Sequence, residues 1–199
     1  MKLVQKSAEL NDYLGSDRYI DLHDASIRRK ANELFAALTD EDEKIRAAYE
    51  FVRDGIKHSR DIDSDIVAVS ASDALRCGEG ICLSKSLLLA ALLRCAGIPA
   101  GLCYQRLASA DTPSGYIIHG LNAVYLSSKN KWMRLDARGN KPGVDARFST
   151  EMEKLAFPVK AERNETDFPT IYATPPPIIM DAWAKCKSHR EYRFDTREL

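Results

Sequence analysis

The stretch "GEGICLSKSLLLAALLRCAGIPAG", residues 78–101, constrains the fold most, because it joins a glycine-rich turn to a very apolar helix. Gly97 and Pro99 are typical of the end of such a helix. Cys82 stands where the helix begins. Two interpretations follow: the thiol is a small apolar group at the point where the helix enters a core, or it is a nucleophile held at a helix N-terminus.

The residues before this stretch predict further helices. Apolar residues recur at helical spacing in residues 24–40, "DASIRRKANELFAALTD", and again in residues 39–56, "TDEDEKIRAAYEFVRDGI". Thr39 is expected to cap the second helix, which has acidic residues in its first turn and ends at Gly55. A shorter helix is expected within "SASDALRCG", residues 70–78.

After Pro99 the pattern changes to strands. Residues 100–108, 116–126 and 131–137 are rich in Ile, Tyr, Val and Leu, and "SSKN", residues 127–130, has the composition of a hairpin turn. Helices followed by an antiparallel sheet predict an α+β fold, in which N-terminal helices pack on the sheet. We expect one domain over residues 1–199.

The C-terminal third is less regular. Prolines are too frequent there for central strands. A last amphipathic helix is expected to begin at the prolines 175–177 and to run through Ser188, and the charged tail after it is expected to fray. This C-terminal helix and tail cover about residues 176–199.

Composition excludes several classes of function. The chain of 199 residues has 29 Lys and Arg against 29 Asp and Glu, and no basic run, which disfavours nucleic-acid binding. The N-terminus lacks an uninterrupted apolar core, and the longest apolar run is far shorter than the roughly 20 residues of a membrane span, so we expect a cytoplasmic protein without membrane contact. Five cysteines without a C-x-x-C pair argue against a disulfide framework and a zinc site, and we expect no metal.

A cysteine nucleophile needs its thiolate form, a base and a group that orients the base. The partial positive charge of a helix N-terminus favours the thiolate of Cys82, and its free N–H groups are suited to hold an oxyanion. Of the four histidines, His23 and His189 lie in polar stretches and are expected to be exposed. His58 belongs with Arg60 and Asp61 to a polar loop cluster, which either has a structural role or borders the same site. His119 differs, because it lies on a predicted strand after two isoleucines.

Asp136 completes the arrangement. If "SSKN" is the hairpin turn, Asp136 lies opposite Leu121 on the neighbouring strand. Leu121 and His119 are two residues apart and share a face, so Asp136 and His119 become diagonal neighbours within hydrogen-bonding reach. Asn122 is a weaker orienting group, because it is three residues from His119 and points to the opposite face.

Three separated motifs resemble the transglutaminase-like superfamily of bacterial and archaeal cysteine hydrolases. They are "GEGICLSKSLLLAALLRCAGIPAG", "HGLNAVYL" and "KWMRLDARGN", and they occur in order with fitting gaps within about residues 71–140. The resemblance implies a papain-like α+β fold, with Cys82 as nucleophile, His119 as general base and acid, and Asp136 as the residue that orients the imidazole. Gly120 and Leu121 after the histidine, and "ARG" after the aspartate, depart from the usual pattern and leave the substrate class open.

Three further residues are weaker candidates. Tyr104 and Gln105 follow the helix into the first strand and are placed to line a substrate cleft, although a strand with alternating burial explains them equally well. Gly80 allows the backbone to approach a substrate closely.

The expected function is cysteine-dependent hydrolysis of an amide in a peptide or protein substrate, without a cofactor. Relatives that cleave the bond between a peptide and a glycan carry C-x-x-C zinc pairs, which this chain lacks, and that subclass is disfavoured. Acyl transfer to an amine, as in cross-linking transglutaminases, and a non-catalytic peptide-binding module on the same fold are the alternatives. The sequence does not reveal the substrate or the oligomeric state.

Overall fold

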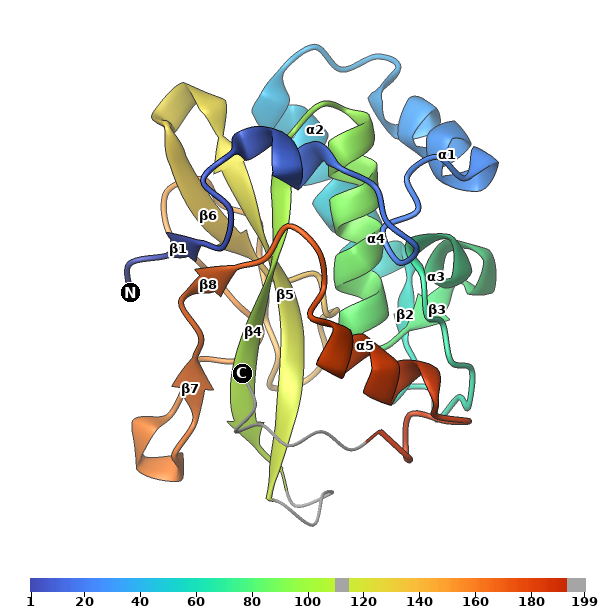
Figure 1. The fold of residues 1–199 in the computed structure, drawn as a ribbon, viewed down its shortest axis with the longest axis vertical. Helices are drawn as coiled ribbons and strands as arrows, with labels where there is room; N and C mark the ends of the chain where they lie inside the picture. Colours follow the sequence, from blue (N-terminus) through green and yellow to red (C-terminus); the bar gives the residue numbers. More distant parts are fainter. Residues whose placement is uncertain (110–114, 193–199) are drawn as a thin grey trace.

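A four-stranded antiparallel sheet and a set of helices on one of its faces make up the computed structural model, which describes residues 1–109 and 115–192 (Figure 1). Strand order in the sheet is β6-β5-β4-β7. The strands are β4 (Ala100–Ala108), β5 (Tyr116–Leu126), β6 (Lys131–Leu135) and β7 (Thr166–Asp167). The expected α+β architecture is therefore confirmed.

The helices form around α4 (Cys82–Cys95), which stands beside the sheet in Figure 1. Its apolar residues are buried on all sides, as for Leu88 and Leu92. The helices α1 (Ala25–Phe35), α2 (Glu41–Glu50) and α3 (Ala71–Cys77) contact it.

Local signals fix where these helices begin and end. The carboxylate of Asp40, not the predicted Thr39, caps α2 by accepting the N–H of Glu43 at 2.9 Å, because a carboxylate also suits the positive end of the helix dipole. At its other end α2 continues into a π-helical turn that closes at Gly55. Ser70 caps α3, and Gly78 ends it in the left-handed conformation (φ 66°) that favours glycine.

The hairpin between β5 and β6 has the register that the sequence predicts. Leu126 pairs with Lys131 and Asn122 with Leu135, around a short 3-10 turn, Ser127–Lys129. Pairing stops at Leu135, so Asp136 leaves the sheet directly after the last paired residue.

The two faces of the sheet pack against different parts of the chain. Val124 belongs to the main core with α4, and the side-chain amide of Asn122 donates to the backbone carbonyl of Ser86 in α4 at 2.9 Å. On the other face, Leu121 packs in a smaller cluster with Tyr13 from the N-terminal segment.

Two parallel pairs of two-residue strands attach outlying segments. The pair β1 (Val4–Gln5) and β8 (Thr170–Ile171) joins the N-terminus to the C-terminal third. The pair β2 (Lys57–His58) and β3 (Glu79–Gly80) places His58 beside Gly80, two residues before the start of α4.

The C-terminal helix α5 (Pro177–Ala184) ends earlier than predicted, and the chain after it is packed rather than frayed. His189 is buried, with its ring Nδ1 at 2.8 Å from the carbonyl oxygen of Ser64, and Tyr192 packs edge-on against Trp183. The expected exposure of His189 is therefore wrong, because its ring is satisfied by a distant loop. Residues 193–199 of the predicted fraying tail lie outside the described residues.

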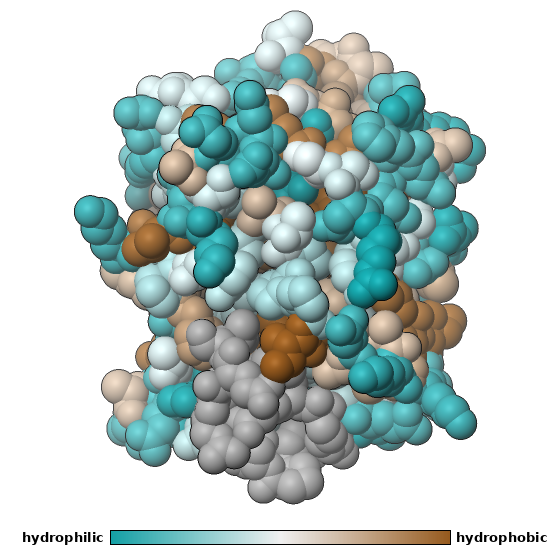
Figure 2. Space-filling model, in the orientation of Figure 1, coloured by the Kyte–Doolittle hydropathy of each residue, from teal (hydrophilic) through white to brown (hydrophobic). Residues whose placement is uncertain are grey.

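The outer surface in this view is mainly hydrophilic, with small, separate hydrophobic patches (Figure 2). Within residues 1–109 and 115–192 no helix is long and apolar enough to cross a membrane.

Candidate active site

Cys82 is the first residue of α4, at the positive end of the helix. The residue before it, Ile81, offers no side-chain cap, so no side chain of the N-cap residue covers the first N–H groups of the helix. The Sγ atom of Cys82 accepts a hydrogen bond from the backbone N–H of Gly120 at 3.4 Å. Helix α4 thus brings the thiol against the middle of strand β5.

His119 is the neighbour of Gly120 on β5, and its imidazole contacts both predicted partners. Ring Nε2 lies 2.8 Å from Oδ2 of Asp136, and the ring also hydrogen-bonds to the thiol of Cys82. Phe157 packs edge-on against the ring at a centroid distance of 5.0 Å. Only 3% of the His119 side chain is exposed, so water competes little for these contacts.

Backbone and side-chain hydrogen bonds hold Asp136 in place. The backbone N–H of Arg138 donates to its Oδ1 at 3.1 Å, and the N–H of Ala156 donates to Oδ2 at 3.0 Å. The hydroxyl of Tyr49 donates to its backbone carbonyl at 3.1 Å. These bonds fix both the carboxylate and the chain that carries it, which is the condition for orienting an imidazole.

The three groups shift one another's pKa in the directions that nucleophilic catalysis requires. Burial raises the pKa of the Cys82 thiol, but the charge of His119 and its hydrogen bond outweigh burial and leave that pKa below its ordinary value. Burial lowers the pKa of His119, but the charges of Asp136 and Cys82 raise it overall to about 10. For Asp136, His119 and two backbone N–H groups overcome burial and lower the pKa of the carboxyl. The site therefore favours a thiolate beside an imidazolium.

A cavity of about 560 Å³ opens over Cys82 and His119. Its size is within the usual range for a small-molecule or peptide subsite. Apolar side chains such as Ile118 and Phe157 line part of it, and charged side chains surround its mouth.

His58, Arg60 and Asp61 also line this cavity, so this loop cluster borders the site in addition to any structural role. His58 is 7% exposed, and its Nδ1 has no hydrogen-bond partner among the described residues. Burial and the neighbouring charge of Arg138 hold the pKa of His58 well below the ordinary value, so the ring is neutral at pH 7. Pairing with Gly80 places His58 at the site. Two-residue parallel pairs have no recognisable sequence pattern, so the sequence does not predict this contact.

The structure does not bring the three weaker candidates to the wall of this cavity. Tyr104 is buried in the core, where it packs edge-on against Tyr172. The side chain of Gln105 donates to Asp167 at 2.8 Å, and Gly80 is buried against Ser84 of α4. Strand β4 is buried on both faces at Tyr104 and Gln105, and Gln105 lines a neighbouring cavity of about 430 Å³.

Lys85 links α4 to the turn that follows α2. One turn after Cys82 on α4, its ammonium is buried and donates to the backbone carbonyls of Arg53 (3.2 Å) and Ile56. These carbonyls belong to the π-helical turn after α2 and the residue that follows it. A lysine in an otherwise apolar helix was the available sequence signal for this contact.

No cluster of three or more His, Cys, Asp or Glu side chains arranged to hold a metal ion occurs in the part of the chain that the structure describes.

A family model described as the transglutaminase-like superfamily matches residues 28–137, more than half of the chain. The chain belongs to the transglutaminase-like superfamily. This confirms the resemblance carried by the three motifs. The match includes Cys82, His119 and Asp136, and it ends one residue after the aspartate. A comparison with curated proteins finds no significant match.

A comparison with solved structures also finds matches. A candidate cysteine protease from Cytophaga hutchinsonii has a TM-score of 0.53 at 20% identity, over 66% of this chain and 43% of its own. A candidate protease from Parabacteroides distasonis (TM-score 0.41, 15% identity, 62% and 25%) and the periplasmic domain of TgpA from Pseudomonas aeruginosa (0.46, 18%, 63% and 46%) are more distant. The chain covers less than half of each of these proteins. The first shows that the two chains share a fold over the matched residues.

Proposed function

We propose that this transglutaminase-like protein is a cysteine-dependent amide hydrolase that acts on peptide or protein substrates. One observation carries the proposal: a thiol at a helix N-terminus and an imidazole line one cavity, and a buried carboxylate binds the imidazole. A cytoplasmic location belongs to the same proposal and is supported by five cysteines that are all free thiols.

In the proposed first half-reaction the thiolate of Cys82 attacks the carbonyl carbon of the amide. The carbonyl oxygen takes up the negative charge in a tetrahedral intermediate. When the intermediate collapses, the C–N bond breaks, the imidazolium of His119 gives its proton to the departing amine, and a thioester remains.

In the second half-reaction water replaces the amine. Neutral His119 takes a proton from the water as it attacks the thioester carbonyl, and collapse of that intermediate releases the carboxylic acid and restores the thiolate. Asp136 keeps its negative charge throughout and holds the imidazole with Nε2 toward the carboxylate. The ring's other nitrogen then serves Cys82.

Two kinds of donor are available for the oxyanion. The N–H groups of the first turn of α4 have no side-chain cap and are next to the nucleophile. The ring of His58 is the second candidate, since it lines the cavity, is neutral, and has an unpartnered nitrogen. A neutral imidazole donates an N–H without competing for the proton of His119.

Turnover of peptide and isopeptide libraries by wild type and by Cys82→Ala tests the proposal. We expect wild type to release products that Cys82→Ala does not, and Cys77→Ala, which changes an exposed thiol, to behave as wild type. An added primary amine distinguishes acyl transfer from hydrolysis, because transfer gives a new amide. Equal results for wild type and Cys82→Ala on every amide would favour the peptide-binding module.

A further inference from the structure

The cavity over Cys82 has a strong excess of positive charge, although the whole chain is neutral. Of the described residues that line it, five carry a positive charge: Arg60, Arg138, Lys141, Lys160 and Arg163. Two carry a carboxylate, Asp61 and Glu165. The imidazolium, thiolate and carboxylate of the catalytic groups add one negative charge in total, which leaves the cavity cationic.

Asp61 does not neutralise the two positive charges beside it, those of Arg138 and Lys141. Its carboxylate accepts hydrogen bonds from the two terminal guanidinium nitrogens of Arg138, one of them at 2.8 Å. It also accepts a hydrogen bond from the ammonium of Lys141 at 2.6 Å. These two cations together hold the pKa of Asp61 below its ordinary value, against the effect of burial. One carboxylate thus serves two cations, and this group keeps a net positive charge.

The loop that carries Arg138 and Lys141 is built to hold them in place. Pro142 and Gly143 occupy the central positions of a tight turn closed by Lys141 and Val144, and Gly143 has the positive φ (83°) that a type II turn requires. The side-chain amide of Asn140 clamps the loop by bonding the N–H (2.7 Å) and carbonyl (3.1 Å) of Ala146. The cations are therefore presented by ordered backbone.

A second group of lining residues, Lys160, Arg163 and Glu165, is cationic for a different reason. The carboxylate of Glu165 is used by the backbone, since it accepts the N–H groups of Lys160 (2.9 Å) and Ala108 (3.3 Å). Arg163 reaches it only at 3.9 Å. Lys160 is exposed at the cavity and its ammonium has no ion pair among the described residues.

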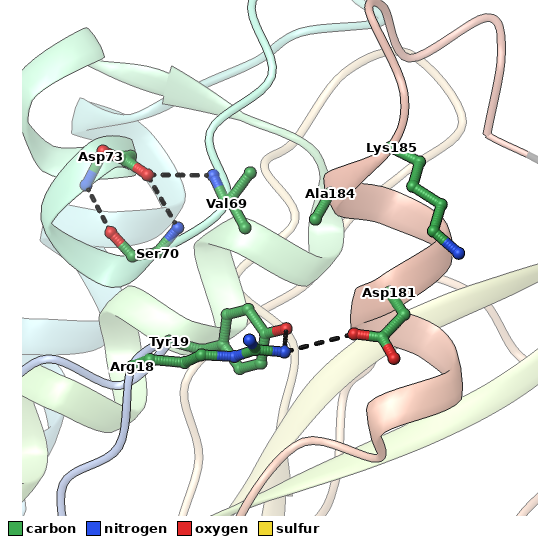
Figure 3. A pocket seen from close by; sticks show the side chains of 8 residues that line it. All are labelled: Arg18, Tyr19, Val69, Ser70, Asp73, Asp181, Ala184 and Lys185. Carbon is green, nitrogen blue, oxygen red and sulfur yellow. Dashed lines mark hydrogen bonds and ion pairs between the residues drawn. The ribbon is translucent and has the colours of Figure 1, made fainter.

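A second cavity on the molecule shows that this excess is local. It is about 430 Å³ and is lined by residues from the N-terminal segment, α3 and α5 (Figure 3). Its two basic side chains, Arg18 and Lys185, are matched by Asp73 and Asp181, and Arg18 pairs with Asp181 at 3.2 Å. Figure 3 draws no interaction at the ammonium of Lys185, which makes this residue a suitable control.

We propose that the cavity over Cys82 selects substrates that carry a carboxylate close to the scissile amide. Arg138, Lys141 and Lys160, which all line the cavity, would attract that carboxylate while the thiolate faces the amide carbonyl. The source is either an acidic side chain or the C-terminal carboxylate of a short peptide. This inference rests on the proposed function for its catalytic part, but the preference for anions is testable without turnover.

The first experiment measures whether the positive charge of the cavity raises the rate at which an anionic reagent alkylates Cys82. Iodoacetate and iodoacetamide alkylate the same thiol, and only iodoacetate is charged. We expect the iodoacetate-to-iodoacetamide rate ratio at Cys82 to exceed that of N-acetylcysteine by about tenfold at low salt, because a cationic cleft concentrates anions. High salt should remove most of the difference.

Variants distinguish the effect of the lysines that line the cavity from the effect of the His119 imidazolium, which also attracts iodoacetate. Lys141→Gln combined with Lys160→Gln should lower the ratio severalfold, whereas Lys185→Gln should leave it as in wild type. A ratio equal to that of N-acetylcysteine, or one that the double variant does not change, would overturn the proposal. Circular dichroism confirms that each variant is folded.

The second experiment identifies the carboxylate. Peptides with Asp or Glu beside the scissile bond are compared with Asn or Gln isosteres, and peptides with a free C-terminus with their carboxamides. We expect kcat/KM to favour one acidic member of these pairs by about tenfold, and the double lysine variant to lose that preference. Equal turnover of acidic and neutral pairs refutes substrate selection. A high alkylation ratio with no hydrolysis of any peptide would instead refute the proposed hydrolase and leave an anion-selective site.

Discussion

Gly120 of β5 faces Leu83 of α4 so closely that a Cβ at residue 120 would lie 2.9 Å from Leu83 Cδ2 and 3.3 Å from Ser86 Oγ. The same glycine donates its N–H to the thiol of Cys82. The missing side chain is therefore what lets helix α4, which carries Cys82, approach strand β5, which carries His119.

Gly120→Ala should separate the two catalytic elements. The added methyl group must push α4 away from β5 or force Leu83 into another rotamer, and such overpacking costs about 1–3 kcal/mol of unfolding free energy. We expect a matching fall in the alkylation rate of Cys82, because the thiol loses contact with His119 and with the N–H of residue 120. Chemical denaturation and labelling kinetics measure the two effects.

Leu83→Ala in the Gly120→Ala background provides the control. Removing the Leu83 side chain makes room for the new methyl group, so the double variant should label faster than Gly120→Ala although Leu83→Ala alone destabilises the core. If Gly120→Ala labels at the wild-type rate, close approach at this position does not matter to the thiol.

The geometry of the candidate site was largely predictable because it depends on local patterns. "SSKN" fixes the hairpin, the hairpin fixes the register, and the register places Asp136 beside His119. Cys82 is placed by the glycine turn and by an apolar helix that has to be buried. In each case the decisive information lies within a few residues.

The surroundings of the site were not predictable, because they depend on contacts between distant segments. The loop that donates the N–H of Ala156 to Asp136 lies in the irregular, proline-rich third of the chain, where no periodicity indicates position. His58 is placed at the cavity by the pairing of two-residue strands. The ring of His189 hydrogen-bonds to the carbonyl of Ser64, a residue 125 positions away in the chain. Tyr104 and Gln105 do not line the cavity over Cys82, because strand β4 is buried on both faces there, and Gln105 lines a neighbouring cavity.

Cys82 should be the first of the five thiols to react with iodoacetamide at pH 7. Its pKa lies below the ordinary value, whereas burial raises the pKa of Cys95, raises that of Cys103 to about 12, and raises that of Cys77 together with nearby carboxylates. Peptide mapping by mass spectrometry after brief labelling measures the order. Faster labelling of the exposed Cys77 would contradict an activated Cys82.

The pH dependence of this labelling reports the ion pair with His119. Because the pKa of Cys82 is lowered, its rate should rise at a pH below the ordinary thiol value of about 8.5. In His119→Ala burial remains and the favourable charge is lost, so the midpoint should move to higher pH. His23→Ala, which removes an exposed histidine, should leave the midpoint unchanged.

Asp136→Asn should remove catalysis without removing the fold. The amide cannot stabilise the imidazolium, so the pKa of His119 falls and less Cys82 is thiolate at pH 7. By analogy with other triads we expect kcat to fall about 10²- to 10⁴-fold. Steady-state kinetics on any peptide that the library screen identifies measures this, and unchanged kcat would remove Asp136 from the mechanism.

The same variant changes how stability depends on pH. The folded-state pKa of Asp136 is lowered, so its contribution is complete above the ordinary carboxyl value of about 3.9 and is lost as the pH falls toward the folded-state value. Urea denaturation of wild type should therefore show an acid decline that is shallower in Asp136→Asn. Asp145→Asn is the control, because that carboxylate is exposed and its ion pairs are screened by water.

His58→Gln and His58→Phe test the second oxyanion donor. Loss of one oxyanion donor lowers kcat by about 10²- to 10³-fold in other acyl-transfer enzymes, with little effect on KM. We expect that loss for Phe, which fills the space without a donor, and partial recovery for Gln, whose amide donates an N–H. The alkylation profile of Cys82 should stay as in wild type in both variants, because an oxyanion donor acts only after the thiolate has attacked. A shift of that profile in His58→Phe would show that the ring supports the thiolate instead, and full activity in both variants would exclude it from the oxyanion site.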